Sequence, residues 1–324
     1  MKRETQRYRL FTFHSQMGCC FSRRPVLHPL PPLPANVVRL HPTTDPELLS
    51  EACECIILSF MGTATTAPEA DMSWAFFGDA RPRHAAPLEP EFVDAPGWRT
   101  FVTFIIRLTF YGYLRRGGCF ALLAGGDGDG SGPGAGKLKV AAATICVPPN
   151  DHRWHIRDTD PVNLICLGML CRLGVPPRSV LGFLTVTGAR CDVLVKTMHV
   201  AHHRHAPGRH WYVGSFAVHP AFQGRGNGKA FLRDTICALG DHDDVAVYLE
   251  TVGARNKGFY GHVGGFEVHE QCVIAYKGSA LGDDGGTAMM VRLPGGGMHG
   301  GMDGGMNGGM NGGPGTRAAE GKVL

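Results

Sequence analysis

Apolar residues recur along the middle of the chain with two different spacings, which predict helices and strands. Helical spacing over 46–60 and 98–111 predicts two amphipathic helices, the first capped by Thr44 or Asp45 with Pro46 in its first turn. Further helices are expected over 226–240 and 255–263. Short apolar runs rich in β-branched residues predict strands at 36–41, 119–124, 138–147, 211–218, 245–250, 266–268, 272–276 and 288–293. This alternation of strands and helices predicts an α/β class with a mixed sheet.

Both ends of the chain lack this periodicity. Residues 1–35 are basic and end in the proline-rich LHPLPPLP, and residues 295–324 repeat a Gly-Gly-Met unit. We expect both segments to be disordered, because neither can bury enough apolar surface to offset the entropy lost on ordering. The folded domain is therefore expected to span 36–294.

The basic leader also carries a possible lipidation signal. Met17-Gly18 followed by Cys19-Cys20 fits a myristoylation pattern with two palmitoylation sites, provided that translation begins at Met17. A chance match in a disordered leader is the simpler interpretation, and an organelle transit peptide is a third, although serine is scarce. We expect a cytoplasmic protein, with membrane attachment or organelle targeting as alternatives.

Charge and cysteine content narrow the possible classes of function. The formal net charge is +4, but residues 1–30 hold six basic groups against one acidic group, so the rest of the chain sums to −1. That balance argues against nucleic acid as a partner. The 11 cysteines include no C-x-x-C pair, which favours a reducing compartment. No apolar run reaches the length of a membrane-spanning helix.

Two polar segments resemble metal-binding or phosphate-binding motifs, but each lacks residues that the motif requires. The glycine-rich stretch between the strands at 119–124 and 138–147 resembles parts of an EF-hand and of a P-loop, and we expect a hairpin loop. Five histidines near residue 200 could bind zinc or nickel, but no cysteine or carboxylate completes the set, so we expect a polar loop and no metal. These five are His199, His202, His203, His205 and His210.

The segment WYVGSFAVHPAFQGRGNGKAFL carries the clearest chemical signal. A strand ends at Val218, and a glycine-rich turn from Gln223 to Gly228 opens a helix. Glycines let a bare backbone approach a ligand, and the amides at a helix N-terminus attract anions such as a pyrophosphate. The side chains of Arg225 and Lys229 can add positive charge. The dinucleotide spacing G-x-G-x-x-G is not met, because position 229 is lysine.

The pattern that is met is Q-x-x-G-x-G, at Gln223, Gly226 and Gly228. It resembles motif A of the GNAT superfamily of acyl-CoA N-acyltransferases, and the downstream LETVGARNKGFYGHVGGFEV resembles motif B of the same family. The elements L-E-T, A-R-N and F-Y are similar to the puromycin N-acetyltransferase group. The resemblance covers 36–293, with a helical insertion at about 162–199.

The resemblance implies a GNAT fold, in which a mixed central sheet is flanked by helices and two central strands splay apart to hold acetyl-CoA. It implies that pantetheine pairs with the backbone of Phe216, Ala217 and Val218. Pyrophosphate would lie on the amides of Gly224, Arg225, Gly226, Asn227, Gly228 and Lys229, with Gln223 shaping the turn. Asn256 matches an asparagine that contacts the cofactor arm, and Tyr260 matches the acid that protonates the departing thiolate.

An alkyl ammonium is mostly protonated at neutral pH, so a base must remove its proton before attack. Glu250 is the leading candidate, followed by His210 and His219, although Glu250 could instead orient the substrate or pair with Arg255. Tyr260 could instead be a packing residue of the core.

The sequence therefore predicts an acetyl-CoA-dependent N-acetyltransferase acting on a small-molecule amine by direct attack in a ternary complex. A protein lysine or N-terminal acetyltransferase and a non-catalytic acyl-CoA-binding module are the alternatives. No metal is required.

Overall fold

The computed structural model describes residues 28–62, 73, 75, 97–114, 117–125, 138–149, 188–277, 279–281 and 286–296. The predicted leader before residue 28, the glycine-rich loop 126–137, the first part of the predicted insertion (162–187) and the tail after residue 296 lie outside these residues.

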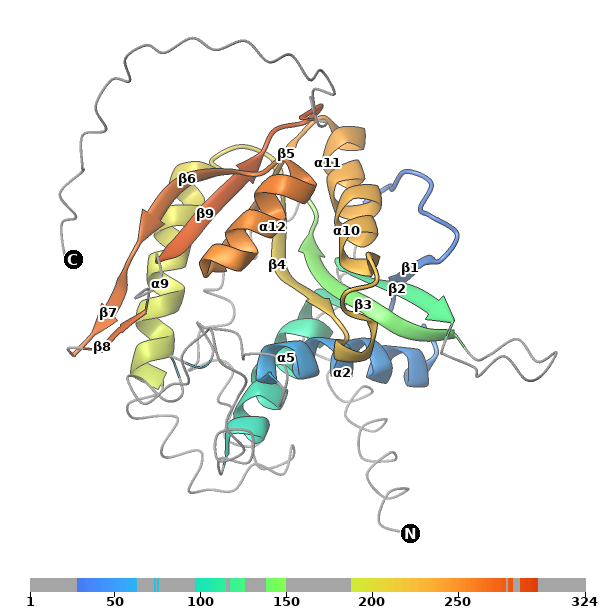
Figure 1. Cartoon of the computed structure of the whole chain (residues 1–324), viewed down its shortest axis with the longest axis horizontal. Helices are drawn as coiled ribbons and strands as arrows, with labels where there is room; N and C mark the ends of the chain where they lie inside the picture. Colours follow the sequence, from blue (N-terminus) through green and yellow to red (C-terminus); the bar gives the residue numbers. More distant parts are fainter. Residues whose placement is uncertain are drawn as a thin grey trace, which may run out of the picture.

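Helices and strands alternate along the described chain much as the apolar spacing predicted (Figure 1). The N-terminal half holds β1 (Val37–Leu40), α2 (Pro46–Met61), α5 (Trp98–Leu114), β2 (Cys119–Gly125) and β3 (Leu138–Val147). The middle holds α9 (Gly188–His205), β4 (His210–Val218), the 3-10 turn η5 (Pro220–Phe222), α10 (Asn227–Phe231), the π-helical η6 (Leu232–Cys237) and α11 (Ala238–Asp243). The remainder holds β5 (Ala246–Val252), α12 (Ala254–Gly264), β6 (Glu267–Cys272), β7 (Ile274–Tyr276), β8 (Ser279–Leu281) and β9 (Thr287–Arg292).

Seven of the described strands form one mixed sheet in the order β1-β2-β3-β4-β5-β9-β6, and β7 pairs with β8 separately. Every pair in the large sheet is antiparallel except β4 with β5, which run parallel. The predicted α/β class with a mixed sheet is confirmed.

The parallel pair β4–β5 separates part of the way along its length. Pairing runs only from His210 opposite Ala246 to Val213 opposite Leu249. Beyond that point β4 continues along β3 to Val218, while β5 continues along β9 to Val252. The register of β4 against β3 shifts at Gly214, which lies next to the point of separation; such a bulge bends a strand away from its neighbour. The two central strands therefore splay, as the resemblance implied.

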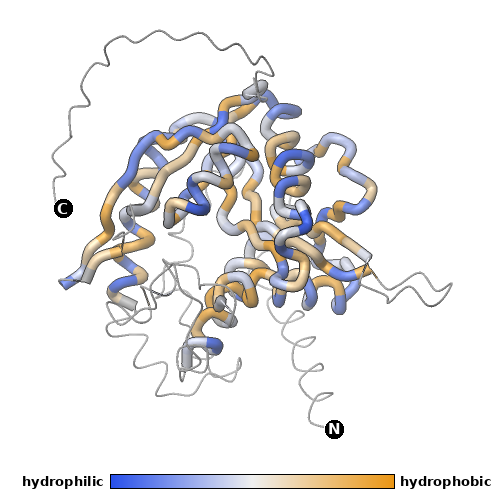
Figure 2. The backbone as a smooth tube through the Cα atoms, viewed as in Figure 1, coloured by the Kyte–Doolittle hydropathy of each residue, from blue (hydrophilic) through white to orange (hydrophobic). Residues whose placement is uncertain are grey.

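Helices cover both faces of the sheet and define two apolar clusters. One cluster joins α2, α5 and α9 to one face, and the other joins α10, η6, α11 and α12 to the opposite face. In Figure 2 the central strands and α5 are strongly hydrophobic, whereas the edge strand β6 is largely hydrophilic. Successive strand residues alternate between the faces, so Tyr212 and Tyr248 face the first cluster while Trp211 and Val247 face the second.

Helix α9 extends further than the sequence indicated. The histidines from His199 to His205 were expected in a loop, yet they form its last turns. Tertiary contacts stabilise these turns: Arg204 and His205 both bind the Glu270 carboxylate of β6, and the ring of His202 stacks on Tyr248. Local propensity is a weak predictor where such contacts exist.

Residues 28–35 pack on the folded domain, although the sequence predicted them to be part of the disordered leader. The imidazole of His28 is buried, lies edge-on to Trp211 at 5.3 Å and hydrogen-bonds Asp243 at 2.6 Å. Leu30 and Leu33 contact the second apolar cluster. The fold therefore begins at or before residue 28.

Candidate functional site

The glycine-rich turn after β4 is shaped by side chains that hydrogen-bond the backbone. Gln223 Nε2 donates to the Val218 carbonyl at 3.0 Å, and Asn227 Nδ2 donates to the Phe222 carbonyl at 3.0 Å. Gly224 and Gly226 have φ of +76° and +80°, a left-handed conformation that strongly favours glycine. A Cβ at either position would meet nothing within 4 Å, so the outer surface of the turn is open.

The helix that follows presents its first amides to this open surface. Gly226 is the N-cap, and the first backbone bond into the helix runs from Ala230 to Gly226. The amides of Asn227, Gly228 and Lys229 precede it and therefore have no acceptor within the helix. Three amides at a helix N-terminus, with two exposed cationic side chains beside them at Arg225 and Lys229, form a cradle for an anion.

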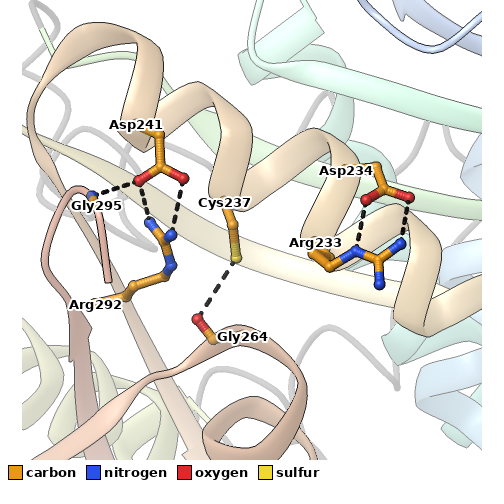
Figure 3. A network of polar contacts seen from close by, with 7 residues as sticks. All are labelled: Arg233, Asp234, Cys237, Asp241, Gly264, Arg292 and Gly295. Carbon is orange, nitrogen blue, oxygen red and sulfur yellow. Dashed lines mark hydrogen bonds and ion pairs between the residues drawn. The ribbon is translucent and has the colours of Figure 1, made fainter. Parts of the chain in front are cut away.

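The cradle helix runs without a break from Asn227 through η6 to Asp243 and is anchored at its far end (Figure 3). Asp241 accepts two hydrogen bonds from the Arg292 guanidinium, both at 2.8 Å, and a third from the backbone amide of Gly295 at 2.7 Å. The Cys237 thiol lies 3.8 Å from the Gly264 carbonyl. These contacts tie the helix to β9 and to the end of α12, which fixes the direction of its N-terminus.

Only some of the predicted β4 backbone groups face the gap between β4 and β5. The amide of His219, directly after the strand, donates to the carbonyl of Ala141 in β3 at 2.9 Å. Alternation then directs the backbone groups of Ala217 towards β3 and those of Phe216 and Val218 towards the gap. The Val218 carbonyl already accepts hydrogen bonds from Gln223 Nε2 and Ser59 Oγ, so its two lone pairs are used. Of the three predicted residues, Phe216 therefore directs both its amide and its carbonyl to the gap, and Val218 directs its amide there.

Tyr260 and Asn256 come from α12, on the same face as the cradle. The Tyr260 ring packs edge-on to Phe216, with centroids 6.2 Å apart, and also contacts Phe259 and Phe266. Asn256 lies in the first turn of α12 and is half-buried. The structure thus brings Tyr260 beside the strand segment that borders the gap.

Glu250 follows Leu249, the last β5 residue that pairs with β4, and so stands where the strands separate. It shares a face with Tyr248, opposite to the face that Tyr260 covers. Burial raises the pKa of Tyr248 and of Tyr212 well above the usual range, and the nearby negative charge of Glu250 raises both further. These phenols therefore stay neutral at physiological pH, and they lie near Glu250 on the same face of the sheet.

The two histidines considered as alternative bases are engaged elsewhere. Nδ1 of His219 accepts the amide hydrogen of Ala221 at 3.2 Å, capping η5, and burial followed by the charge of Lys139 lowers its pKa. His210 Nδ1 lies 2.7 Å from the Gly208 carbonyl, and its Nε2 lies 2.6 Å from Nε2 of His202. Glu250 is the candidate that stands at the gap.

Three neighbours of this site were not predicted from the sequence: Tyr212, Tyr248 and His202. The alternation Tyr248-Leu249-Glu250 places a phenol and a carboxylate on one strand face, and that pattern could have revealed Tyr248. His202 comes from a helix far from β5 in the sequence, and no local pattern indicates it.

The described part of the chain contains no cluster of three or more His, Cys, Asp or Glu side chains arranged to hold a metal ion. Among its helices, none combines the length and apolar character needed to cross a bilayer.

No protein-family model matches the chain, and no curated protein matches it. Solved structures do resemble it. Arylalkylamine N-acetyltransferase 2 from Aedes aegypti is 9% identical, with a TM-score of 0.43, and the match covers 80% of this chain and 99% of that one. A polyamine N-acetyltransferase from Drosophila melanogaster is 11% identical, with a TM-score of 0.46 and coverage of 79% and 99%. A protein from Corynebacterium glutamicum described as histone acetyltransferase HPA2 and related acetyltransferase is 16% identical, with a TM-score of 0.43 and coverage of 80% and 96%. The function proposed below rests on the residues of this chain.

Proposed function

We propose that this protein is a GNAT-type N-acetyltransferase that moves the acetyl group of acetyl-CoA to a small-molecule primary amine. The observation that carries the proposal is the splay of β4 from β5 beside an anion cradle. Pairing stops after Val213, and the cradle follows the same strand at Gly224–Lys229. A long substrate with a pyrophosphate in its middle and a thioester at its end suits a cradle joined to a gap.

Acetyl-CoA would bind along β4 with its pyrophosphate on the amides of Asn227, Gly228 and Lys229. The open surface over Gly224 and Gly226 leaves room for that anion. Phe216 offers its backbone groups to the pantetheine amides, which directs the thioester towards the point where the strands separate. The half-buried Asn256 in the first turn of α12 is assigned to the cofactor arm, as the resemblance implies.

Glu250 is proposed to remove one proton from the acceptor ammonium, which frees the nitrogen lone pair. The amine then attacks the thioester carbonyl carbon, and a carbon–nitrogen bond forms. As the tetrahedral adduct collapses, the carbon–sulfur bond breaks and Tyr260 donates its phenolic proton to the leaving thiolate. The second nitrogen proton leaves in the same step and restores the tyrosine. The net products are the amide, CoA and one released proton. Holding the amine next to the thioester supplies a large part of the rate enhancement.

The proposal is tested by following thiol release from acetyl-CoA with a panel of small primary amines, while calorimetry measures acetyl-CoA binding. Tyr260→Phe should keep acetyl-CoA affinity and reduce turnover about 10- to 1000-fold. Tyr276→Phe, on β7, is the matched control and should turn over normally. Binding without turnover for every amine, with peptide substrates also inactive, would identify a non-catalytic acyl-CoA-binding module. Turnover of peptides alone would identify a protein acetyltransferase.

A further inference from the structure

Two histidine rings lie directly against the phenols that surround Glu250. The ring of His202, from α9, stacks on Tyr248 with centroids 4.5 Å apart and an interplanar angle of 6°. It also lies over Tyr212 at 4.6 Å, tilted by 33°. His202 Nε2 is 2.6 Å from Nε2 of His210, the first residue of β4. Helix α9, β4 and β5 thus each contribute to one cluster.

Hydrogen bonding limits how many protons this histidine pair can hold. A carbonyl oxygen only accepts, so Nδ1 of His210 must carry the hydrogen that it donates to Gly208. Only one hydrogen fits between the two Nε2 atoms at 2.6 Å. The pair is therefore either neutral or singly charged, since a second extra proton would place two hydrogens between the nitrogens. It behaves as one titratable unit.

The phenols around the cluster do not change their charge near neutral pH. Burial and the charge of Glu250 keep the phenols of Tyr212 and Tyr248 protonated by raising their pKa. The remaining neighbours that titrate or carry charge come from α5, α9 and β6. They are Tyr113 on α5, His199, His203, Arg204 and His205 on α9, and Glu270 and Cys272 on β6. Glu270 is already paired with Arg204 and His205. Among the ring contacts that the structure shows to Tyr212 and Tyr248, those from His202 and His210 are the ones whose charge varies near neutral pH. The variable charge in direct contact with the phenols around Glu250 is therefore that of the histidine pair.

We propose that the His202–His210 pair sets the net charge of the wall around Glu250 and so selects the charge of the amine that the site accepts. This inference rests on the proposed function and names its substrate class. With the pair neutral, Glu250 leaves the wall with one negative charge, which favours an alkylammonium. With the pair protonated, the imidazolium over the Tyr248 ring cancels that charge, and the wall favours a neutral amine. His202 and His210 act as positioning residues through their charge and do not touch the reacting atoms.

The test uses two amines of similar size that differ in charge. Benzylamine is a cation and aniline is neutral throughout the pH range in which histidine titrates. Calorimetry on the full chain saturated with CoA, which has no acetyl group to transfer, measures the binding of each amine. Benzylamine affinity should fall about tenfold between about pH 8 and pH 6, and aniline affinity should not change. A parallel loss for both amines, or no binding of benzylamine at either pH, would overturn the proposal.

Variants assign the effect to the pair. His202→Phe keeps a ring on Tyr248 and leaves Nε2 of His210 facing an apolar ring, where an added proton would have no acceptor, so benzylamine affinity should become independent of pH. Lys196→Gln removes an exposed cation of the same helix, paired with Asp192, and should keep the wild-type pH dependence. An unchanged pH dependence in His202→Phe would contradict the proposal.

A measurement on the unmodified protein covers the case in which His202→Phe does not fold. Nitrogen-15 NMR of labelled histidine should show His202 and His210 taking up a single proton between them, whereas two independent one-proton titrations would refute the shared charge. Failure of the proposed function gives a different result, namely no acetyl transfer to any amine. Normal acetyl transfer with pH-independent benzylamine binding would contradict this inference and leave the proposed function in place.

Discussion

Replacing His28 with alanine should destabilise the whole domain, although His28 lies in a segment that the sequence assigned to a disordered leader. Its side chain is 7% exposed and the Asp243 side chain is 10% exposed, so solvent does little to weaken their hydrogen bond at 2.6 Å. His28 also packs edge-on against Trp211, the completely buried second residue of β4.

The expected loss follows from these contacts. A hydrogen bond to a carboxylate contributes about 1.5–3 kcal/mol, and an edge-on aromatic contact adds about 0.5–1.5 kcal/mol. Asp243 keeps its second hydrogen bond, from Trp211 Nε1 at 2.8 Å, so its carboxylate is not left wholly unpaired. We therefore expect the free energy of unfolding to fall by about 2–4 kcal/mol, which lowers Tm by about 5–15 °C.

Urea unfolding monitored by tryptophan fluorescence measures this change. The matched control is His242→Ala, at an exposed histidine next to Asp243 in the same helix, which should shift the midpoint very little. A chain that starts at residue 36 should be less stable than one that starts at residue 28, because it also lacks Leu30 and Leu33. Equal midpoints for wild type and His28→Ala would refute the reasoning.

Two further variants test the cradle and its anchor. A Cβ at Gly228 would lie 2.9 Å from a methyl group of Val218, so Gly228→Ala should push the helix N-terminus away from the strand and weaken acetyl-CoA binding in calorimetry; Gly125→Ala, with open space around it, should have no effect. Burial raises the pKa of Asp241, but hydrogen bonds from Arg292 and from a backbone amide outweigh it and lower that pKa overall. The ionised carboxylate therefore stabilises the fold above its ordinary pKa, and this contribution is lost as the pH falls through the lowered value. Asp241→Asn should lower the free energy of unfolding by about 1–3 kcal/mol at neutral pH, a modest loss because the carboxylate is partly exposed. The variant should also lose less stability than wild type as the pH falls, measured by thermal denaturation. An equal loss of stability at acid pH in both proteins would show that another group causes it.

Local features of the sequence were sufficient to predict most of the helices and strands and the position of the anion cradle. The strand that ends at Val218, the turn with Gln223 and the helix after Gly226 follow from residues within a few positions of one another. Glycine at 224 and 226 reflects a backbone conformation that other residues rarely adopt, which is information held at a single position. The resemblance to the GNAT family supplied Tyr260 as a candidate acid, and the need to deprotonate an ammonium supplied Glu250 as a candidate base.

Three features depended on residues far apart in the chain. The limit of the β4–β5 pairing follows from the register of two strands and the shift at Gly214. The last turns of α9 form because Arg204 binds the Glu270 carboxylate and the His202 ring stacks on Tyr248. His28 is ordered by Asp243, 215 residues further along.

The sequence by itself thus determined the order of the elements, the α/β class and the position of the anion cradle, because periodicity, capping and glycine conformation are local properties. Only the tertiary structure decided that Glu250 and Tyr260 occupy opposite faces at the gap, that Ala217 turns its backbone towards β3, and that His202 stacks beside Glu250. These outcomes depend on strand register and on packing between distant segments, so no single stretch of the sequence determines the free energy of such contacts.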